Sequence, residues 1–163
     1  MCGRFHDEEP RDVRVTYPGP VARLDADERA QRVIATDDFC SYTEPGGTMR
    51  HFVRGLIEIP VPEESSYFGY GAWVELDAHQ IERVASLWRD ATGADAPPFE
   101  GTLANELRPY VNTEGLSAVL ELREVERLPA ITVSGSHRLV TDIRRGISVA
   151  RARELAGAVL HRV

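Results

Sequence analysis

Two neighbouring segments of the sequence place an arginine, a tryptophan and two glutamates where they could share one face of a β-sheet. In the first predicted strand, Arg54 and Glu58 alternate onto the same side, and in the second Trp73 and Glu75 do so. An arginine binds carboxylates, an indole stacks on flat groups, and a glutamate accepts or moves protons. We therefore predict a site in which Arg54 and Trp73 bind a polar or anionic ligand and Glu58 and Glu75 are the catalytic candidates.

Two glycines add to this candidate site. Gly69 and Gly71 fall on the same side of the second strand as the tryptophan, and without side chains they leave space or allow another backbone to approach. The paired strands would then form the floor of a pocket. The alternative is an ion pair between Arg54 and one of the two glutamates, on a solvated sheet face that binds no ligand.

Three further side chains are candidates outside the strand pair. His137 follows a Ser-Gly-Ser segment at a predicted helix start, where a neutral imidazole could act as a catalytic base or as a hydrogen-bond donor. Asn105 and Tyr110 stand in a loop-like segment and could contribute amide and phenol groups to ligand binding. The alternatives are a helix-capping or surface histidine, and local turn chemistry for the asparagine.

The composition limits the classes of function. The 163 residues include 26 acidic and 19 basic residues and carry a net charge of −7, so we expect neither nucleic acid nor an anionic membrane as a partner. All 19 basic residues are arginines, which excludes Schiff-base and phosphate-loop lysine chemistry. No apolar run approaches the roughly 20 residues that span a bilayer. Two cysteines make no disulfide framework, which favours a reduced, cytoplasmic setting.

The predicted elements centre on two strands, His51–Val61 and Phe68–Leu76, joined closely enough to pair antiparallel. The others are a short helix at 25–32, strands at 39–43, 117–126 and 130–134, a short strand or turn at 102–107, and helices from 77, from 136 and from 148. We therefore predict one domain over residues 1–163, with a loop-like segment over 1–20. Its expected class is α+β, a small antiparallel sheet with flanking helices and a C-terminal helix.

Several sequence blocks together resemble one family of bacterial proteins. The blocks are HFVRGLIEIPV (51–61), AWVEL (72–76), GTLANELRPY (101–110) and HRL (137–139) followed by RGI (145–147). In this order and spacing they are similar to the domain-of-unknown-function family numbered 2199, over nearly the whole chain. The resemblance implies a bacterial protein without implying an activity, because the family is named for having no assigned function.

A metal site at the N-terminus is a further possibility that the resemblance raises. Members of the family open with a Cys-x-x-Cys-Gly element and a nearby histidine, whereas this sequence begins Met-Cys-Gly with Cys2 and His6. The first cysteine of the pair would fall before Met1. A zinc site would need two more ligands than Cys2 and His6, so we expect no cofactor and keep zinc as an alternative.

Two functional hypotheses follow. The first is a small, acidic, cytoplasmic binding or accessory protein without catalytic activity, whose partner is either a protein or a polar small ligand. Acidic runs at 7–9 and 25–28 could attract a basic partner protein. The alternative is a cofactor-independent small-molecule enzyme with a glutamate acid/base and Arg54 as the anchor for an anionic substrate. The sequence leaves open whether the protein is an enzyme.

Overall fold

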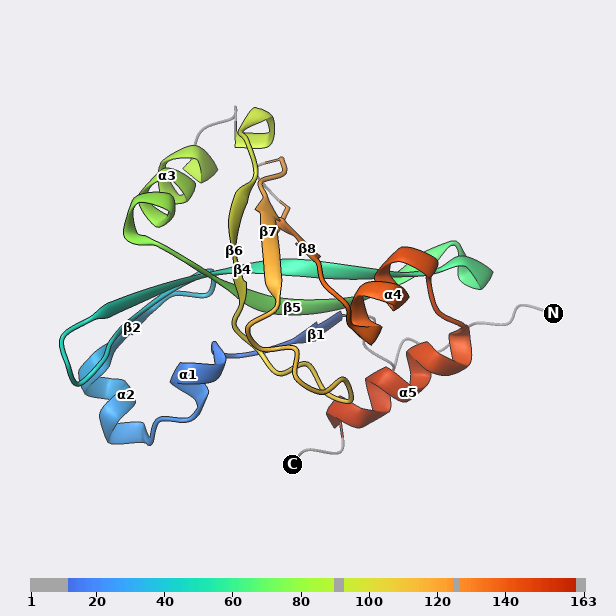
Figure 1. Ribbon diagram of the computed structural model, residues 1–163, viewed down its shortest axis with the longest axis horizontal. Coiled ribbons are helices and arrows are strands. Elements are labelled where there is room, and N and C mark those ends of the chain that lie inside the picture. The colour runs from blue at the N-terminus through green and yellow to red at the C-terminus, as the bar shows by residue number, and fades with distance from the viewer. Residues whose placement is uncertain (1–11, 90–92, 125–126, 161–163) are drawn as a thin grey trace.

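The computed structural model describes residues 12–89, 93–124 and 127–160, and Figure 1 shows their arrangement. The strands and longer helices are, in chain order, β1 (Asp12–Arg14), α1 (Gly19–Ala22), α2 (Ala26–Arg32), β2 (Val33–Ala35), β3 (Phe39–Thr43), β4 (Met49–Val61), β5 (Ser66–Leu76), α3 (Ala78–Arg89), β6 (Phe99–Leu103), β7 (Ser117–Glu121), β8 (Ala130–Val133), α4 (Arg138–Arg145) and α5 (Val149–Leu160). Two short 3-10 helices cover Pro62–Glu64 and Gly93–Asp95.

The strands β4 and β5 form a long antiparallel hairpin that organises the fold. Their register runs from the pair His51–Leu76 to the pair Val61–Ser66. From Val53 to Val61 the odd-numbered residues of β4, such as Ile57 and Ile59, are buried, whereas most even-numbered ones stay partly exposed. This alternation is expected for strands with one face against a core.

The prediction of an α+β protein with a small antiparallel sheet and flanking helices is wrong, because the hairpin belongs to a closed barrel. The strand β6 pairs with β5 at Val74 and Glu75, β7 pairs with β6, and β8 pairs with β7. The circle closes where β8 pairs in parallel with β4 at Leu56. Five strands form the barrel, and β1, β2 and β3 extend the sheet beyond it. Closure removes open edges, which a small sheet would leave exposed.

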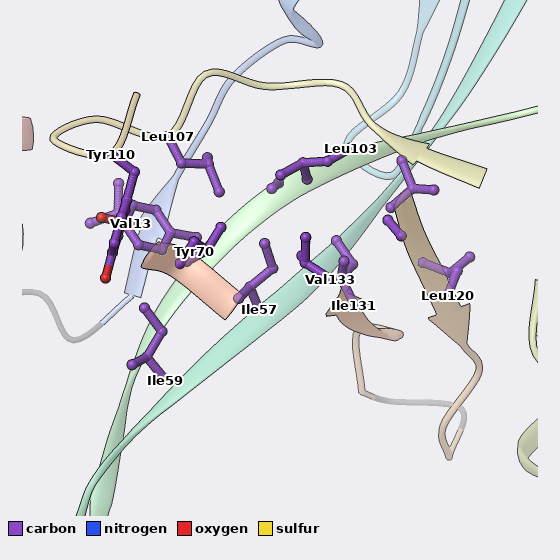
Figure 2. Close-up of a cluster of buried hydrophobic side chains, with 14 of the residues drawn as sticks. Val13, Ile57, Ile59, Tyr70, Leu103, Leu107, Tyr110, Leu120, Ile131 and Val133 are labelled. Carbon is purple, nitrogen blue, oxygen red and sulfur yellow. The ribbon is translucent and has the colours of Figure 1, made fainter. Parts of the chain in front are cut away.

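The barrel interior holds the main hydrophobic core. Side chains from every barrel strand meet there, among them Ile57, Tyr70, Leu103, Leu120 and Ile131 (Figure 2). Val13 of β1 joins this core from outside the ring. The helices α4 and α5 add further members, Leu139 and Leu155. The helices therefore cover the barrel and do not form a layer of their own.

A second, smaller cluster lies on the outer face of the hairpin. Its buried members are Val21, Cys40, Tyr42, Phe52, Trp73 and Ala104. Phe52 of β4 and Trp73 of β5 project to the same side of the hairpin, which is the side opposite to the barrel core. The N-terminal segment around α1 covers them through Val21. This packing shows that part of the predicted ligand face is covered by the chain itself.

The two ends of the long axis carry different elements. Figure 1 shows α1, α2 and β2 at one end and α4 and α5 at the other. We call the three-stranded extension at the first end the flap; it consists of β2, β3 and residues 49–53 of β4. The helix α3 packs on the flap through Trp88, whose ring lies 5.4 Å from that of Phe39.

The N-terminal part differs locally from its predicted loop. Where residues 12–20 are described, β1 pairs in parallel with β5 and α1 begins at Gly19. A three-residue strand with one buried side chain, Val13, has too short an alternation to be recognised in a sequence. In the described part of the chain, no helix has the length and apolar character to cross a membrane.

Candidate functional site

The β4–β5 register brings the predicted strand residues together. Arg54 pairs directly with Trp73, and Glu58 pairs directly with Gly69. Directly paired residues lie on the same side of a sheet, so the expected shared face is present. Trp73 is only 1% exposed, and its Nε1 donates a 3.0 Å hydrogen bond to the carbonyl oxygen of Val15. The indole is therefore a buried anchor for the N-terminal segment and does not form an open wall.

The space above the two glycines is occupied by β1. A side chain at Gly69 would collide with Oδ1 of Asp12 and with Leu56, and Gly71 lies beside the backbone of Arg14. Asp12 and Gly69 are register partners on adjacent strands. The glycines thus allow β1 to approach β5 closely. We find no vacant volume at Gly69 in which a ligand could lie.

Each predicted charge on this face has a partner of opposite charge. Nη2 of Arg54 donates to Oδ1 of Asp38 at 3.1 Å. Nη1 of Arg123 donates to Oε1 of Glu58 at 2.8 Å. Asp38 lies in the turn just before β3, and Arg123 lies just after β7, so both partners are distant in sequence from the charges they bind. The arginine anchor and one predicted catalytic carboxylate are therefore engaged within the protein.

Glu75 is held by the strongest of these ion pairs. Arg50 binds both of its carboxylate oxygens, with Nη2 at 2.7 Å from Oε1 and Nε at 2.8 Å from Oε2. Glu44 approaches the same guanidinium at 3.4 Å. Hydrogen bonding to Glu75 raises the pKa of Arg50 above its ordinary value. A bidentate pair of this kind fixes the glutamate and leaves it poorly placed to exchange protons with a ligand.

Asp12 is a charged residue of this face that the sequence analysis missed. Burial raises the pKa of Asp12, and the nearby carboxylate of Glu58 raises it further. Asp12 falls in the segment predicted to be a loop, and no local pattern places it beside Glu58. The two carboxylates flank Gly69, and their mutual repulsion destabilises the folded protein when both are ionised.

His137 caps a helix. Its Nδ1 accepts a hydrogen bond from the backbone N–H of Leu139 at 2.9 Å, and its Nε2 lies 2.6 Å from the carbonyl oxygen of Val111. A carbonyl can only accept, so Nε2 carries the proton and the imidazole is neutral. Both ring nitrogens are occupied. The imidazole is therefore held as the N-cap of α4 and is not available as a free base.

Asn105 and Tyr110 are buried and bonded to other parts of the chain. Oδ1 of Asn105 accepts from the backbone N–H of Trp73 at 2.8 Å, and its Nδ2 donates to the carbonyl oxygen of Tyr17 at 2.9 Å. The hydroxyl of Tyr110 donates to Asp142 at 2.6 Å. Both side chains connect distant segments, so the structure gives each a structural role and no open face toward a ligand.

The predicted metal ligands Cys2 and His6 lie outside the described residues. The other cysteine, Cys40, is a buried free thiol whose pKa burial raises to about 11. Within the described residues, no group of three or more His, Cys, Asp or Glu side chains could hold a metal ion. His51 instead contacts Ser41, with Nδ1 at 3.0 Å from the hydroxyl oxygen.

Two clefts are present, and the first of them borders the predicted face at Glu75. One, of about 570 Å³, is formed by the start of β4, the end of β5, the start of α3 and part of β6. Its lining includes Met49, His51 and Leu76, and also Glu75, which is bound there to Arg50. The other, of about 470 Å³, runs along α4 and is lined by residues 135–138, 140, 141 and 144. The first cleft is assembled from elements distant in sequence, which no local pattern specifies, whereas the second is lined by one continuous segment that includes the predicted residue His137.

Comparison with known proteins supports the resemblance seen in the sequence. The family model described as "Uncharacterized protein conserved in bacteria (DUF2199)" matches residues 1–147. No curated protein and no solved structure matches the chain. The family match carries no assigned activity, so the functional argument depends on the geometry of this chain.

Proposed function

The chain belongs to the DUF2199 family of uncharacterized bacterial proteins, and from its geometry we propose that it is a small binding protein that captures a basic protein partner through the flap. One observation carries this proposal. Ile34 and Met49, two large apolar side chains that are 79% and 53% exposed, project from the same face of the flap. Beyond the Phe39 end, which α3 covers, this sheet face leaves both apolar side chains available to a protein partner.

The flap offers both a face and an edge to a partner. Register pairs align Ile34 with Ser41 and Met49 with Thr43, so all four side chains share one side. The helix α3 covers the Phe39 end of this side, and the 570 Å³ cleft adjoins Met49. In the described part of the chain, β2 pairs with β3 alone and leaves its other edge open. An extended segment could add to that edge.

The charge of the flap region selects the chemistry of the partner. Residues 25–53, which span α2 and the whole flap, contain six acidic residues and three arginines, a net charge of −3. Like charges would repel a second copy of the same surface, whereas a basic protein would be attracted and steered toward it. Apolar contact at Ile34 and Met49 would then supply affinity, with the surrounding carboxylates supplying specificity.

The state of the predicted catalytic residues argues against the enzyme hypothesis. Glu58 and Glu75 are paired with arginines, Arg54 is paired with Asp38, and both nitrogens of His137 are occupied. A cofactor-independent enzyme with a glutamate acid/base would need a carboxylate free to exchange protons with a ligand, whereas Glu75, which lines the 570 Å³ cleft, has both oxygens bound to Arg50. Binding without catalysis needs no cofactor. A cytoplasmic location, which the low cysteine content favours, belongs to the same proposal.

A capture experiment with matched variants tests this function. Immobilised wild-type protein, Ile34→Asp and Val111→Asp are exposed to bacterial extract. Val111 is 70% exposed and lies outside the flap, so it controls for loss of an apolar surface residue and for the added charge. We expect wild type and Val111→Asp to retain the same basic protein, and Ile34→Asp to retain at least about tenfold less of it.

Two results would contradict the proposal. One is equal capture by all three proteins, which would place the interaction outside the flap. The other is that the captured partner is acidic, because the charge argument would then fail. Thermal unfolding of each variant, measured in parallel, ensures that a loss of capture reflects the surface and not the fold.

A further inference from the structure

The cleft along α4 has a lining unlike the rest of this acidic protein. We call it the α4 cleft; it is an open surface cleft of about 470 Å³, and its lining includes Ser136, Arg138, Thr141 and Arg144. Among the described residues, no aspartate or glutamate lines it. Volumes of roughly 300–1,000 Å³ are typical of small-molecule sites. The α4 cleft therefore has the size of a ligand site and a lining rich in hydrogen-bond donors.

The guanidinium groups of the α4 cleft are largely free of internal partners. Arg144 forms no ion pair within the described residues, and its side chain is exposed. Arg138 contacts Asp142 only through Nε, at 3.6 Å, while its side chain stays 70% exposed. These two arginines differ from those of the hairpin face, where Arg50, Arg54 and Arg123 are each bound to a carboxylate.

The one acidic residue of α4 is turned away from the cleft. Asp142 is 8% exposed, and its Oδ2 accepts the hydrogen bond from the Tyr110 hydroxyl. Its other oxygen, Oδ1, lies 3.6 Å from Nε of Arg138, so Asp142 offsets the charge of the arginines only in part. Residues 135–154 carry five arginines and two acidic residues, a net charge of +3 in a chain whose total is −7. The positive charge is thus gathered at the end of the molecule opposite the flap (Figure 1).

From this geometry we propose that the α4 cleft binds a small-molecule oxyanion, that is, a metabolite-sized ligand carrying a phosphoryl or carboxylate group. Arginine forms paired hydrogen bonds with both groups, and the Ser136 hydroxyl can add another. His137 shapes the cleft without binding the anion, because its Nε2 donates to Val111 and its Nδ1 accepts from Leu139. This site is separate from the flap and independent of the function proposed there.

A titration followed by amide chemical shifts tests the site on the whole protein. Inorganic phosphate is added to isotope-labelled wild type, Arg144→Ala and Arg145→Ala at constant ionic strength. Arg144 lines the cleft, whereas Arg145 is its exposed neighbour on the same helix and does not. We expect saturable shifts confined to residues 135–144, an apparent Kd raised at least about tenfold in Arg144→Ala, and a Kd within about twofold of wild type in Arg145→Ala.

Further probes identify the ligand chemistry. Glucose 6-phosphate and citrate compare a phosphoryl with a carboxylate ligand, and tighter binding of either one than of inorganic phosphate supports a metabolite site. Equal weakening by Arg144→Ala and Arg145→Ala would overturn the proposal in favour of general attraction to positive charge. A single-stranded oligonucleotide that binds more tightly than every small anion and also shifts α5 would overturn it in favour of nucleic acid. Absence of saturable shifts with all probes would overturn it as well.

Discussion

The hydroxyl of Tyr110 donates a 2.6 Å hydrogen bond to Oδ2 of Asp142, and both residues are buried. The bond joins the segment after β6 to the middle of α4. The guanidinium of Arg151 lies 5.3 Å from the Tyr110 ring, so α5 is held at the same point. A single phenol therefore connects the loop, α4 and α5 on the surface of the barrel.

We expect Tyr110→Phe to lower the free energy of unfolding by about 1.5–3 kcal/mol, since a buried hydrogen bond to a carboxylate is lost and Asp142 keeps only its long contact with Arg138. Urea unfolding measures the change. Tyr67→Phe is the control, because Tyr67 lies on the surface at 37% exposure. A Tyr110→Phe protein as stable as the control would show that the bond contributes nothing.

The stability of the protein at alkaline pH should depend on the ionisation of two buried phenols, those of Tyr70 and Tyr110. Burial raises the pKa of Tyr70 and of Tyr110, and the hydrogen bond to Asp142 raises the latter further. A free phenol ionises near pH 10. Each phenol has a higher pKa in the folded protein than in the unfolded chain. Its contribution to the free energy of unfolding is therefore complete below about pH 10 and is lost as the pH rises toward the folded pKa.

Unfolding measured from pH 8 upward should therefore show stability that falls above about pH 10. The slope should be smaller in Tyr70→Phe and in Tyr110→Phe. Ultraviolet titration provides a second readout. Each substitution should remove one phenol from the high-pH part of the titration curve of the folded protein. Loss of a phenol that ionises near pH 10 instead would mean that burial does not raise the pKa of that side chain.

Closure of the barrel depends on Gly101 in β6. A side chain there would overlap the backbone carbonyl of Glu75 and would also reach Leu76 at 2.8 Å. We expect Gly101→Ala to destabilise the protein by about 1–3 kcal/mol, since β6 must move away from β5. Gly46→Ala is the matched control, because nothing lies within 4 Å of its added carbon, and its effect should stay within about 0.5 kcal/mol. Equal unfolding midpoints for the two variants would contradict this account.

Local patterns in the sequence predicted the individual elements better than the architecture. The strand predicted over His51–Val61 matches β4, and the helix predicted from residue 77 matches α3, at whose start Asp77 and Gln80 exchange hydrogen bonds. Barrel closure depends on one parallel pair, Leu56 with Ala130, whose members are distant in sequence. No local pattern specifies such a pairing, so the strands were predicted without the ring.

The same limit applies to the candidate site. Alternation placed Arg54 and Trp73 on one face, and the register confirms that placement. What decides their chemistry is the neighbour that each one meets. Asp38 reaches Arg54 from the turn before β3, and Arg123 reaches Glu58 from beyond β7. These neighbours are set by the tertiary fold, so the sequence could identify chemically capable residues and could not show that they were already paired.

Asp12 and Glu58 lie on the two strands that flank Gly69, each as its register partner. Burial raises the pKa of Asp12, and the charge of Glu58 raises it further. The free carboxyl ionises near pH 3.9. Because folding raises this pKa, the ionised Asp12 destabilises the fold at neutral pH, and the cost disappears as the pH falls through the unfolded value.

We therefore expect Asp12→Asn, which keeps the shape of the side chain, to be more stable than wild type at pH 7, with the difference lost near pH 3. Urea midpoints at the two pH values measure it. Asp37→Asn is the control, because Asp37 is exposed and its Oδ1 faces Arg14 at 3.0 Å instead of a carboxylate. It should show no gain at pH 7. If the Asp12→Asn protein were less stable than wild type at pH 7, Asp12 would have to form a favourable contact on the outer face of the hairpin. That contact would have to outweigh the repulsion between the two carboxylates.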